Sequence, residues 1–153
     1  MIDSMKIREA KSEDSEFISQ LVISLSAYYL EEPSMSLPQW FIESISTTSF
    51  KRRIGSSDYV SFVCLADDKV VGFISLKHGT HLFHLFVSES HQCKGIARKL
   101  WSHAIQSGGA SEITVRSSLF AVPVYKAFGF KETGDVGVID GLKYQPMSWR
   151  VCA

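Results

Sequence analysis

The stretch "HLFHLFV", residues 81–87, constrains the fold of this chain more than any other stretch. It is apolar at odd and even positions alike, which predicts a strand covered on both faces, in the middle of a sheet. A short polar turn follows, and "IARKLW" then begins a helix with apolar residues at helical spacing. The chain therefore runs from a buried strand, through a turn, directly into the N-terminus of a helix.

The elements on either side of this unit predict a mixed α/β sheet. Two apolar runs joined by Asp67 and Asp68 indicate a hairpin, and Ser12 is expected to cap the first helix. Pro123 should lie in the first turn of a late helix, because proline breaks helix interiors. Strands are expected at 5–10, 59–66, 69–79, 81–87, 112–117, 130–134 and 143–151, and helices at 13–25, from 38 onward, at 96–107 and at 121–128. This order predicts a sheet of six to seven strands with about four helices on its two faces.

Length and composition favour a single domain over residues 1–153. The 16 basic and 16 acidic residues cancel, so neither a nucleic-acid nor a membrane partner is expected. No apolar run approaches the roughly 20 residues of a membrane span, and the polar N-terminus is unlike a secretory signal. Cys64, Cys93 and Cys152 are far apart and include no CxxC pair, which argues against a disulfide framework and a cysteine-based zinc site. These features predict a reduced, cytoplasmic location.

The turn after the central strand has the features of an anion site. The first N–H groups of a helix have no partner within the helix, and the helix dipole adds positive character there. Gly95 has no Cβ and lets the backbone approach an anion closely, and Lys94 and Arg98 offer charge-assisted contacts. Neither a P-loop nor a GxGxxG pattern is present. The pattern that is present, Gln92-x-x-Gly95-x-Ala97, would also suit an ordinary strand–helix turn with solvated basic residues.

A second stretch, "SSLFAVPVYKAFGF" at 117–130, lies downstream of this turn. Together the two stretches resemble the GNAT superfamily of acetyl-CoA-dependent N-acetyltransferases. The first resembles its Q/R-x-x-G-x-G/A signature, and the second resembles its later segment, with Tyr125 at the tyrosine position and Gly129-Phe130 as the terminal pair. There are two departures. Ser118 stands where the family often has asparagine, and Ala97 replaces the more frequent last glycine.

The resemblance implies a GNAT-type acyl-CoA N-acyltransferase fold and a cofactor site. Acetyl-CoA would lie in a V-shaped gap between the strands at 81–87 and 112–117. The backbone of the first strand would pair with the pantetheine arm, and the amides of residues 92–98 would hold the pyrophosphate. The cofactor-binding residues implied are Leu85, Phe86, Val87, Gln92, Cys93, Lys94, Gly95, Ile96, Ala97, Arg98 and Ser118.

The resemblance also implies transfer of the acetyl group to a primary amine by direct attack in a ternary complex, without an acyl-enzyme. Cys93 is then not needed as a nucleophile. Tyr125 is the expected donor to the departing thiolate, although its spacing with Ala121 and Phe128 also suits a core position. A non-catalytic acyl-CoA-binding or regulatory domain on the same fold is the alternative, and Tyr125 favours the enzyme.

The general base is less determined. Glu89 follows the cofactor strand, and His84 on that strand belongs to the residue type that titrates near neutrality. Either residue also suits a structural role, as a solvated loop carboxylate or a satisfied strand histidine. No metal is expected, because His81, His84 and His91 have no acidic or cysteine partner at a ligand-like spacing.

The acceptor side would be formed by the first helices and the last strands. Tyr28, Tyr29 and Trp40 are the expected substrate-binding residues, with Phe41 and Tyr144 as further aromatic walls. Three carboxylates are expected to attract a cationic amine, namely Glu31, Glu32 and Glu43. The acceptor is expected to be a small-molecule amine or a peptide or protein amine, and a homodimer is possible on this fold.

Overall fold

The computed structural model describes residues 5–26 and 37–151 of the chain. Its strands are β1 (Met5–Glu9), β2 (Tyr59–Ala66), β3 (Lys69–Lys77), β4 (His81–Val87), β5 (Glu112–Ser118), β6 (Lys131–Glu132), β7 (Gly137–Ile139) and β8 (Leu142–Arg150). Its helices are α1 (Ser15–Ser24), α2 (Gln39–Ser44), α3 (Thr47–Ile54), α4 (Ile96–Gly108) and α5 (Val122–Ala127). Short 3₁₀ turns include η1 (Ser12–Asp14), η3 (Glu89–His91) and η4 (Leu119–Ala121).

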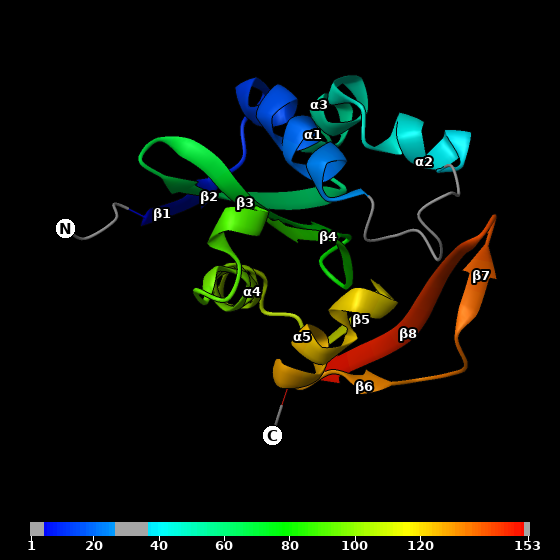
Figure 1. The fold of residues 1–153 in the computed structure, drawn as a ribbon. Helices are drawn as coiled ribbons and strands as arrows, with labels where there is room; N and C mark the ends of the chain where they lie inside the picture. Colours follow the sequence, from blue (N-terminus) through cyan, green and yellow to red (C-terminus); the bar gives the residue numbers. More distant parts are fainter. Residues whose placement is uncertain (1–4, 27–36, 152–153) are drawn as a thin grey trace.

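The strands form one mixed sheet in the order β1-β2-β3-β4-β5-β8-β6, with β7 paired to β8. In Figure 1, α1, α2 and α3 lie on one side of the sheet, and α4 and α5 lie on the other. Two buried clusters match these layers, since one packs α1 and α3 against the sheet and the other packs α4 and α5 against it. Among the described residues, no helix is long and apolar enough to cross a membrane.

The predicted mixed α/β architecture is confirmed, and the sheet has eight strands where six to seven were predicted. The strand that sequence reasoning missed is β7, whose three residues carry no alternating apolar pattern and leave Val138 and Ile139 exposed. The hairpin prediction is confirmed. Asp67 and Asp68 have φ values of 49° and 66°, which a tight two-residue turn between twisted strands requires. Pro123 lies in the first turn of α5, as predicted.

The predicted cap of the first helix is wrong. Ser12 begins η1, and α1 begins only at Ser15. The residue that organises this corner is Asp14, whose carboxylate accepts a hydrogen bond from the Lys11 N–H at 2.7 Å. The same carboxylate accepts two hydrogen bonds from Arg8, at 2.8 and 2.9 Å, and so ties η1 to β1. The prediction rested on a serine followed by acidic residues. That local pattern does not show that Asp14 pairs with Arg8, six residues earlier in a strand.

The strand at 81–87 is central, with β3 on one side and β5 on the other. Its antiparallel register with β3 shifts between Ser75 and Leu76, so that Ser75 opposes His84 and Leu76 opposes Leu82. Phe83 is the extra residue of this bulge, and a bulge bends its strand. The parallel pairing with β5 covers two residues of β4, His81 and Leu82, and ends at the bulge. From there on β4 and β5 diverge, and the V-shaped gap lies between them.

Candidate cofactor and acceptor site

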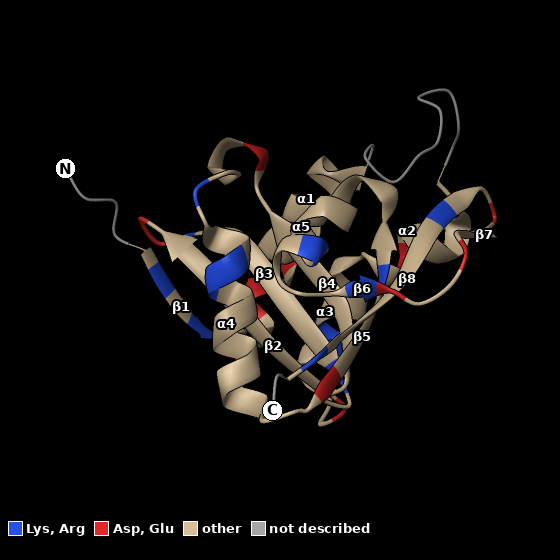
Figure 2. Cartoon of the chain, turned by 90° about the horizontal axis from the view of Figure 1, so that it is seen from below, with Lys and Arg blue, Asp and Glu red and all other residues tan. Residues whose placement is uncertain are grey.

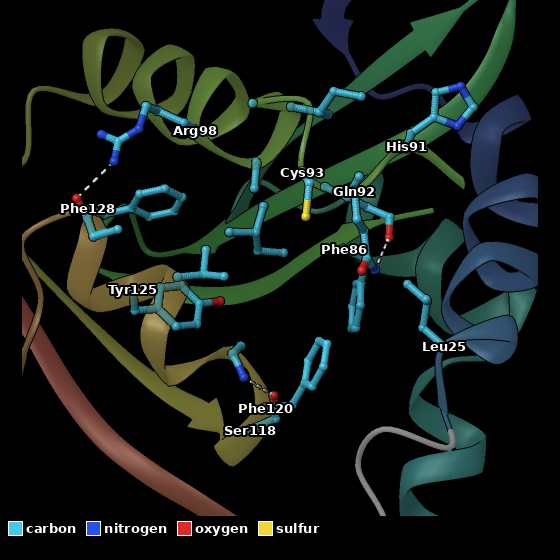
Figure 3. A pocket seen from close by; sticks show the side chains of 18 residues that line it. Leu25, Phe86, His91, Gln92, Cys93, Arg98, Ser118, Phe120, Tyr125 and Phe128 are labelled. Carbon is cyan, nitrogen blue, oxygen red and sulfur yellow. Dashed lines mark hydrogen bonds between the residues drawn. The ribbon is translucent and has the colours of Figure 1, made fainter. Parts of the chain in front are cut away.

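A cavity of about 420 Å³ lies where β4 and β5 diverge. The end of β4, the turn after η3, the first turn of α4 and the segment from η4 to α5 line it, and Leu25 closes it from the end of α1 (Figure 3). Of the eleven predicted cofactor-binding residues, all but Lys94 line this cavity. The structure thus gathers at one place two stretches that lie some twenty residues apart in the sequence.

The turn that leads into α4 has a backbone that ordinary residues rarely adopt. Gly95 is at φ 80° and ψ 9°, in the left-handed region, and forms the N-cap of α4. A Cβ built on Gly95 would meet no protein atom within 4 Å. The glycine is therefore required by the backbone conformation and leaves open space over the turn, and both suit an anion bound there. Cys93, two residues earlier, is also left-handed, at φ 63°.

The amides at the start of α4 are available for hydrogen bonding. The first hydrogen bond of the helix runs from the Lys99 N–H to the Gly95 carbonyl, at 3.0 Å. The N–H groups of Ile96, Ala97 and Arg98 precede that bond and, as in any helix, have no acceptor within it. The side chain of Gln92 fixes the turn, because its Nε2 donates to the Val87 carbonyl at 3.1 Å. Gln92 therefore holds the turn against the end of β4.

Arg98, expected to offer charge-assisted contacts, lines the cavity and also contacts α5. Its Nη2 donates to the Ala127 carbonyl at 2.9 Å, and its Cζ lies 5.2 Å from the centre of the Phe128 ring. The guanidinium thus joins α4 to the C-terminal end of α5, as Figure 3 shows. This contact connects two helices that flank the cavity, and Arg98 is itself one of the lining residues.

Tyr125 combines the two roles that its spacing left open. Its ring is buried, with 5% of the residue exposed, and packs edge-on against Phe128 and Phe130, with ring centres 6.2 and 5.3 Å away. Figure 3 shows its hydroxyl directed into the cavity. Burial raises the pKa of this phenol above its ordinary value. The group therefore stays protonated at neutral pH and can donate a hydrogen bond.

Ser118 ends β5 and caps the next turn. Its hydroxyl oxygen accepts a hydrogen bond from the Ala121 N–H at 3.3 Å. A serine at this position, where asparagine is frequent in the family that the chain resembles, can therefore cap the turn. The hydroxyl hydrogen is not used in this bond. Ser118 lines the cavity just below the place where the strands separate.

A second cavity, of about 540 Å³, is lined by α2, β4, β5 and the β7–β8 hairpin. The two cavities share a wall made of Leu85, Phe86, Ser118, Ala121 and Tyr125. A molecule in one cavity and a molecule in the other would therefore both lie beside these residues.

Trp40, Phe41 and Tyr144 line the second cavity, as expected of aromatic walls on the acceptor side. The Trp40 Nε1 donates to the Asp140 carboxylate at 2.6 Å, which joins α2 to the turn between β7 and β8. Tyr28, Tyr29, Glu31 and Glu32 lie outside the described residues. Glu43 does not line either cavity and accepts a hydrogen bond from the Gln39 side chain at 3.3 Å.

The two candidate bases have different surroundings. His84 lies among four phenylalanine rings, with ring centres 4.5 to 6.2 Å away, and its Nε2 is 3.5 Å from Arg53 Nη2. Burial, followed by the positive charge of Arg53, lowers the pKa of His84 to about 3. A histidine with that pKa is a weak base. Glu89 lies exposed in η3, one residue beyond Ser88, and is not part of either cavity wall.

Sequence reasoning missed a set of cations on the acceptor side. Lys77, Arg116 and Lys143 come from β3, β5 and β8 and line the second cavity. They are spread over 67 positions of the chain and share no motif, so only the strand order brings them together. Seen from below (Figure 2), basic and acidic segments are interspersed over the helices, strands and turns.

The fold and the site have counterparts among known proteins. A family model described as an acetyltransferase (GNAT) domain matches residues 22–151. A PaiA N-acetyltransferase from Thermoplasma acidophilum, solved with coenzyme A, superposes with a TM-score of 0.76 at 21% identity, over 97% of this chain and 99% of that one. A GCN5-related N-acetyltransferase from Rhodopseudomonas palustris gives 0.77 at 20% identity, over 99% of both chains. The ribosomal-protein-S18-alanine N-acetyltransferase of Escherichia coli gives 0.66 at 20%, over 98% and 96%. At such identities the likeness to these three structures shows the fold.

Proposed function

Because this chain belongs to the GNAT acetyltransferase family and is an acetyltransferase, we propose that it moves the acetyl group of acetyl-CoA to a primary amine by direct attack in a ternary complex. The observation that carries this proposal is the pair of cavities that share a wall at Tyr125. One cavity has the turn and helix N-terminus suited to a pyrophosphate, and the other is free for an amine. We further propose that residues 1–153 form one such domain.

The residues of the first cavity fit coenzyme A. The backbone of Leu85, Phe86 and Val87 lies beyond the last pairing of β4 with β5 and lines the first cavity, where a pantetheine arm would lie beside it. The amides at the start of α4, after the open left-handed turn at Gly95, suit a pyrophosphate. The Thermoplasma protein of the same fold was solved with coenzyme A, which supports this choice of ligand.

Acetyl-CoA supplies an acyl group activated as a thioester. In the transfer, the nitrogen–carbon bond forms as the carbon–sulfur bond breaks, the nitrogen loses a proton and the sulfur gains one. The Tyr125 hydroxyl, protonated and directed into the cavity, is the proposed donor of the proton to sulfur. Glu89 is the proposed acceptor of the proton from nitrogen, through water, because the surroundings of His84 make it too weak a base. Cys93 takes no part through its sulfur.

The experiment that tests the proposal has a binding step and a turnover step. Saturating coenzyme A is expected to raise the melting temperature, because a ligand that binds only the folded state stabilises it. Acetyl-CoA mixed with a panel of primary amines is then expected to release free thiol at a rate that depends on the amine. An unchanged melting temperature at saturating coenzyme A would overturn the cofactor site. Binding without thiol release from any amine would overturn the transfer.

A cytoplasmic location and a homodimer stay predictions. The described cysteines are both free, Cys64 in the core and Cys93 at the cavity. Size-exclusion chromatography with light scattering would give the oligomeric state.

A further inference from the structure

We propose that the acceptor amine carries an anionic group, a carboxylate or a phosphate monoester, which Lys77 and Arg116 bind in the second cavity. The inference rests on the proposed acetyl transfer and names the class of molecule that enters the acceptor side. It differs from the sequence-based expectation that glutamates attract a cationic amine.

The sheet register places the two cations on either side of β4, on the face that the cavity occupies. Lys77 of β3 pairs with His81 of β4, and His81 pairs with Thr114 of β5. Paired residues point to the same face of a sheet, and so do residues two positions apart. Arg116 therefore shares this face with Lys77 and His81. All three line the cavity, so an anion between β3 and β5 would be within the span of both basic side chains.

Aromatic rings, and not carboxylates, support these two cations. The Lys77 Nζ lies 5.9 Å from the centre of the Tyr59 ring, and the Arg116 Cζ lies 5.3 Å from the centre of the Tyr144 ring. A ring face attracts a cation but accepts none of its N–H groups as a carboxylate would. In the described part of the chain, neither Lys77 nor Arg116 forms an ion pair. Their hydrogen-bonding capacity thus remains available to a ligand.

The residues in the described wall of the cavity that are charged at neutral pH are all cations. Lys77, Arg116 and Lys143 line it, and no Asp or Glu of 5–26 or 37–151 does. Asp140 lies close by, but its carboxylate accepts the hydrogen bond from Trp40. The pKa of His81, which lies between the two cations, is lowered by burial and then by the charges of Arg116 and Lys77. An amine with a second positive charge would be repelled here, whereas an anion would be attracted.

The same field suits the reaction. An amine must be neutral to attack a carbonyl, and nearby positive charge lowers the pKa of an amine by disfavouring its protonated form. The cations would thus hold the anionic end of the acceptor and favour the reactive form of its other end. An amine that is already neutral has less need of a general base to remove a proton before it attacks. This agrees with the described wall of the cavity, which has no carboxylate and in which His84 is a weak base.

Matched acceptors test the inference. Amino acids are compared with their carboxamides, which keep the chain and remove the negative charge, and aminoalkyl phosphates are compared with the matching amino alcohols. We expect kcat/KM to be about tenfold higher for the anionic member of the preferred pair, mainly through a lower KM. The preference should weaken at high ionic strength, because salt screens charges near the surface. Which pair shows the preference distinguishes a carboxylate from a phosphate.

Variants locate the effect. Arg116→Gln and Lys77→Gln should raise KM for the anionic acceptor severalfold and raise it more than KM for the neutral partner, so that the preference between the two falls. Arg116→Glu should reverse the preference. Lys69→Gln is the matched control, since Lys69 is an exposed lysine at the opposite end of β3, and it should keep the wild-type preference.

The failures can be told apart. Equal or better turnover of the neutral acceptors, or a preference that survives in both Arg116→Gln and Lys77→Gln, would overturn the inference while the acetyltransferase function stands. Coenzyme A binding without thiol release from any acceptor, charged or neutral, would overturn the proposed function, and the inference with it.

Discussion

At the scale of single residues, Tyr125 combines a packed ring with a hydroxyl at the cavity, where the proposed reaction would use it. Its ring fills the space between Phe128 and Phe130, and its hydroxyl reaches the wall that the two cavities share. Because burial raises the pKa of the phenol, the proton is retained where a free tyrosine would lose it. The same burial that makes the residue part of the core keeps it competent as a donor.

Tyr125→Phe separates the two roles. The variant keeps the ring and loses only the hydroxyl, so the melting temperature and the affinity for coenzyme A should stay close to those of the wild type. Turnover should fall on the order of 10²-fold, the usual effect of removing a positioned acid. Steady-state kinetics and calorimetry measure both. Wild-type turnover in the variant would remove Tyr125 from the mechanism.

The raised pKa of Tyr125 has a matching consequence for pH dependence. Ionisation of the phenol requires a pH above its raised pKa, so wild-type turnover should show no loss from Tyr125 up to about pH 10, the ordinary value for tyrosine.

Gly95 and Gly109 form a matched pair for testing the turn. Both lie in the left-handed region, at φ 80° and 67°, at opposite ends of α4, and a Cβ on either would meet open space. Valine at either position should therefore cost a similar backbone strain, of order 1–3 kcal/mol. Only Gly95→Val should also weaken binding of coenzyme A, measured by titration calorimetry on folded protein. Equal losses of affinity in both variants would make Gly95 an ordinary turn glycine.

At the scale of elements, the corner between β1 and α1 depends on one buried ion pair. Burial alone would raise the pKa of the Asp14 carboxyl, but the hydrogen bonds from Arg8 and the Lys11 N–H bring it below its ordinary value. A carboxyl whose pKa is lower in the folded state stabilises the protein above its unfolded pKa, and that contribution is lost as the pH falls through the folded value. The free energy of unfolding should therefore lose the contribution of this pair as the pH falls into the acid range.

Asp14→Asn should lower the free energy of unfolding at pH 7 by about 2 kcal/mol, because it removes charge-assisted hydrogen bonds at a buried site. The difference from the wild type should shrink as the pH falls below about 4. Urea unfolding at several pH values measures it. Glu16→Gln, an exposed change in the first turn of α1, is the control and should shift stability by less than about 0.5 kcal/mol. A pH-independent difference would contradict the ion-pair account.

At the scale of the whole molecule, the divergence of β4 and β5 leaves room for the first cavity, which bears on whether the proposed reaction passes through a ternary complex. The two cavities share a wall but have different linings, so the proposed reaction would have both molecules bound at once. Initial rates at varied acetyl-CoA and amine should therefore give intersecting double-reciprocal lines, the sign of a ternary complex. Mass spectrometry after incubation with acetyl-CoA alone should show no acetyl group on Cys93. Parallel lines with an acetylated Cys93 would point to an acyl-enzyme instead.

The sequence by itself determined the elements and the position of the cofactor turn. Apolar periodicity predicts the strands and helices, because burial of one face depends on residues close together in the chain. The helix that begins after Gly95 and the proline at the start of α5 are equally local, and the structure has both where they were predicted. The start of the first helix was predicted wrongly at Ser12. The helix start depends on Asp14, and the side chain that Asp14 pairs with, Arg8, lies in β1.

Only the tertiary structure decided the separation of β4 from β5, the wall shared at Tyr125 and the charge of the acceptor cavity. The bulge at Phe83 exists only relative to the register of β3. Lys77, Arg116 and Lys143 line one cavity only through strand order. The low pKa of His84 depends first on its burial and then on an arginine 31 positions away in α3. Local patterns predict the conformation of a segment. The shape of a cavity and the electrostatic potential inside it depend on residues that are far apart in the sequence and that only the fold brings together.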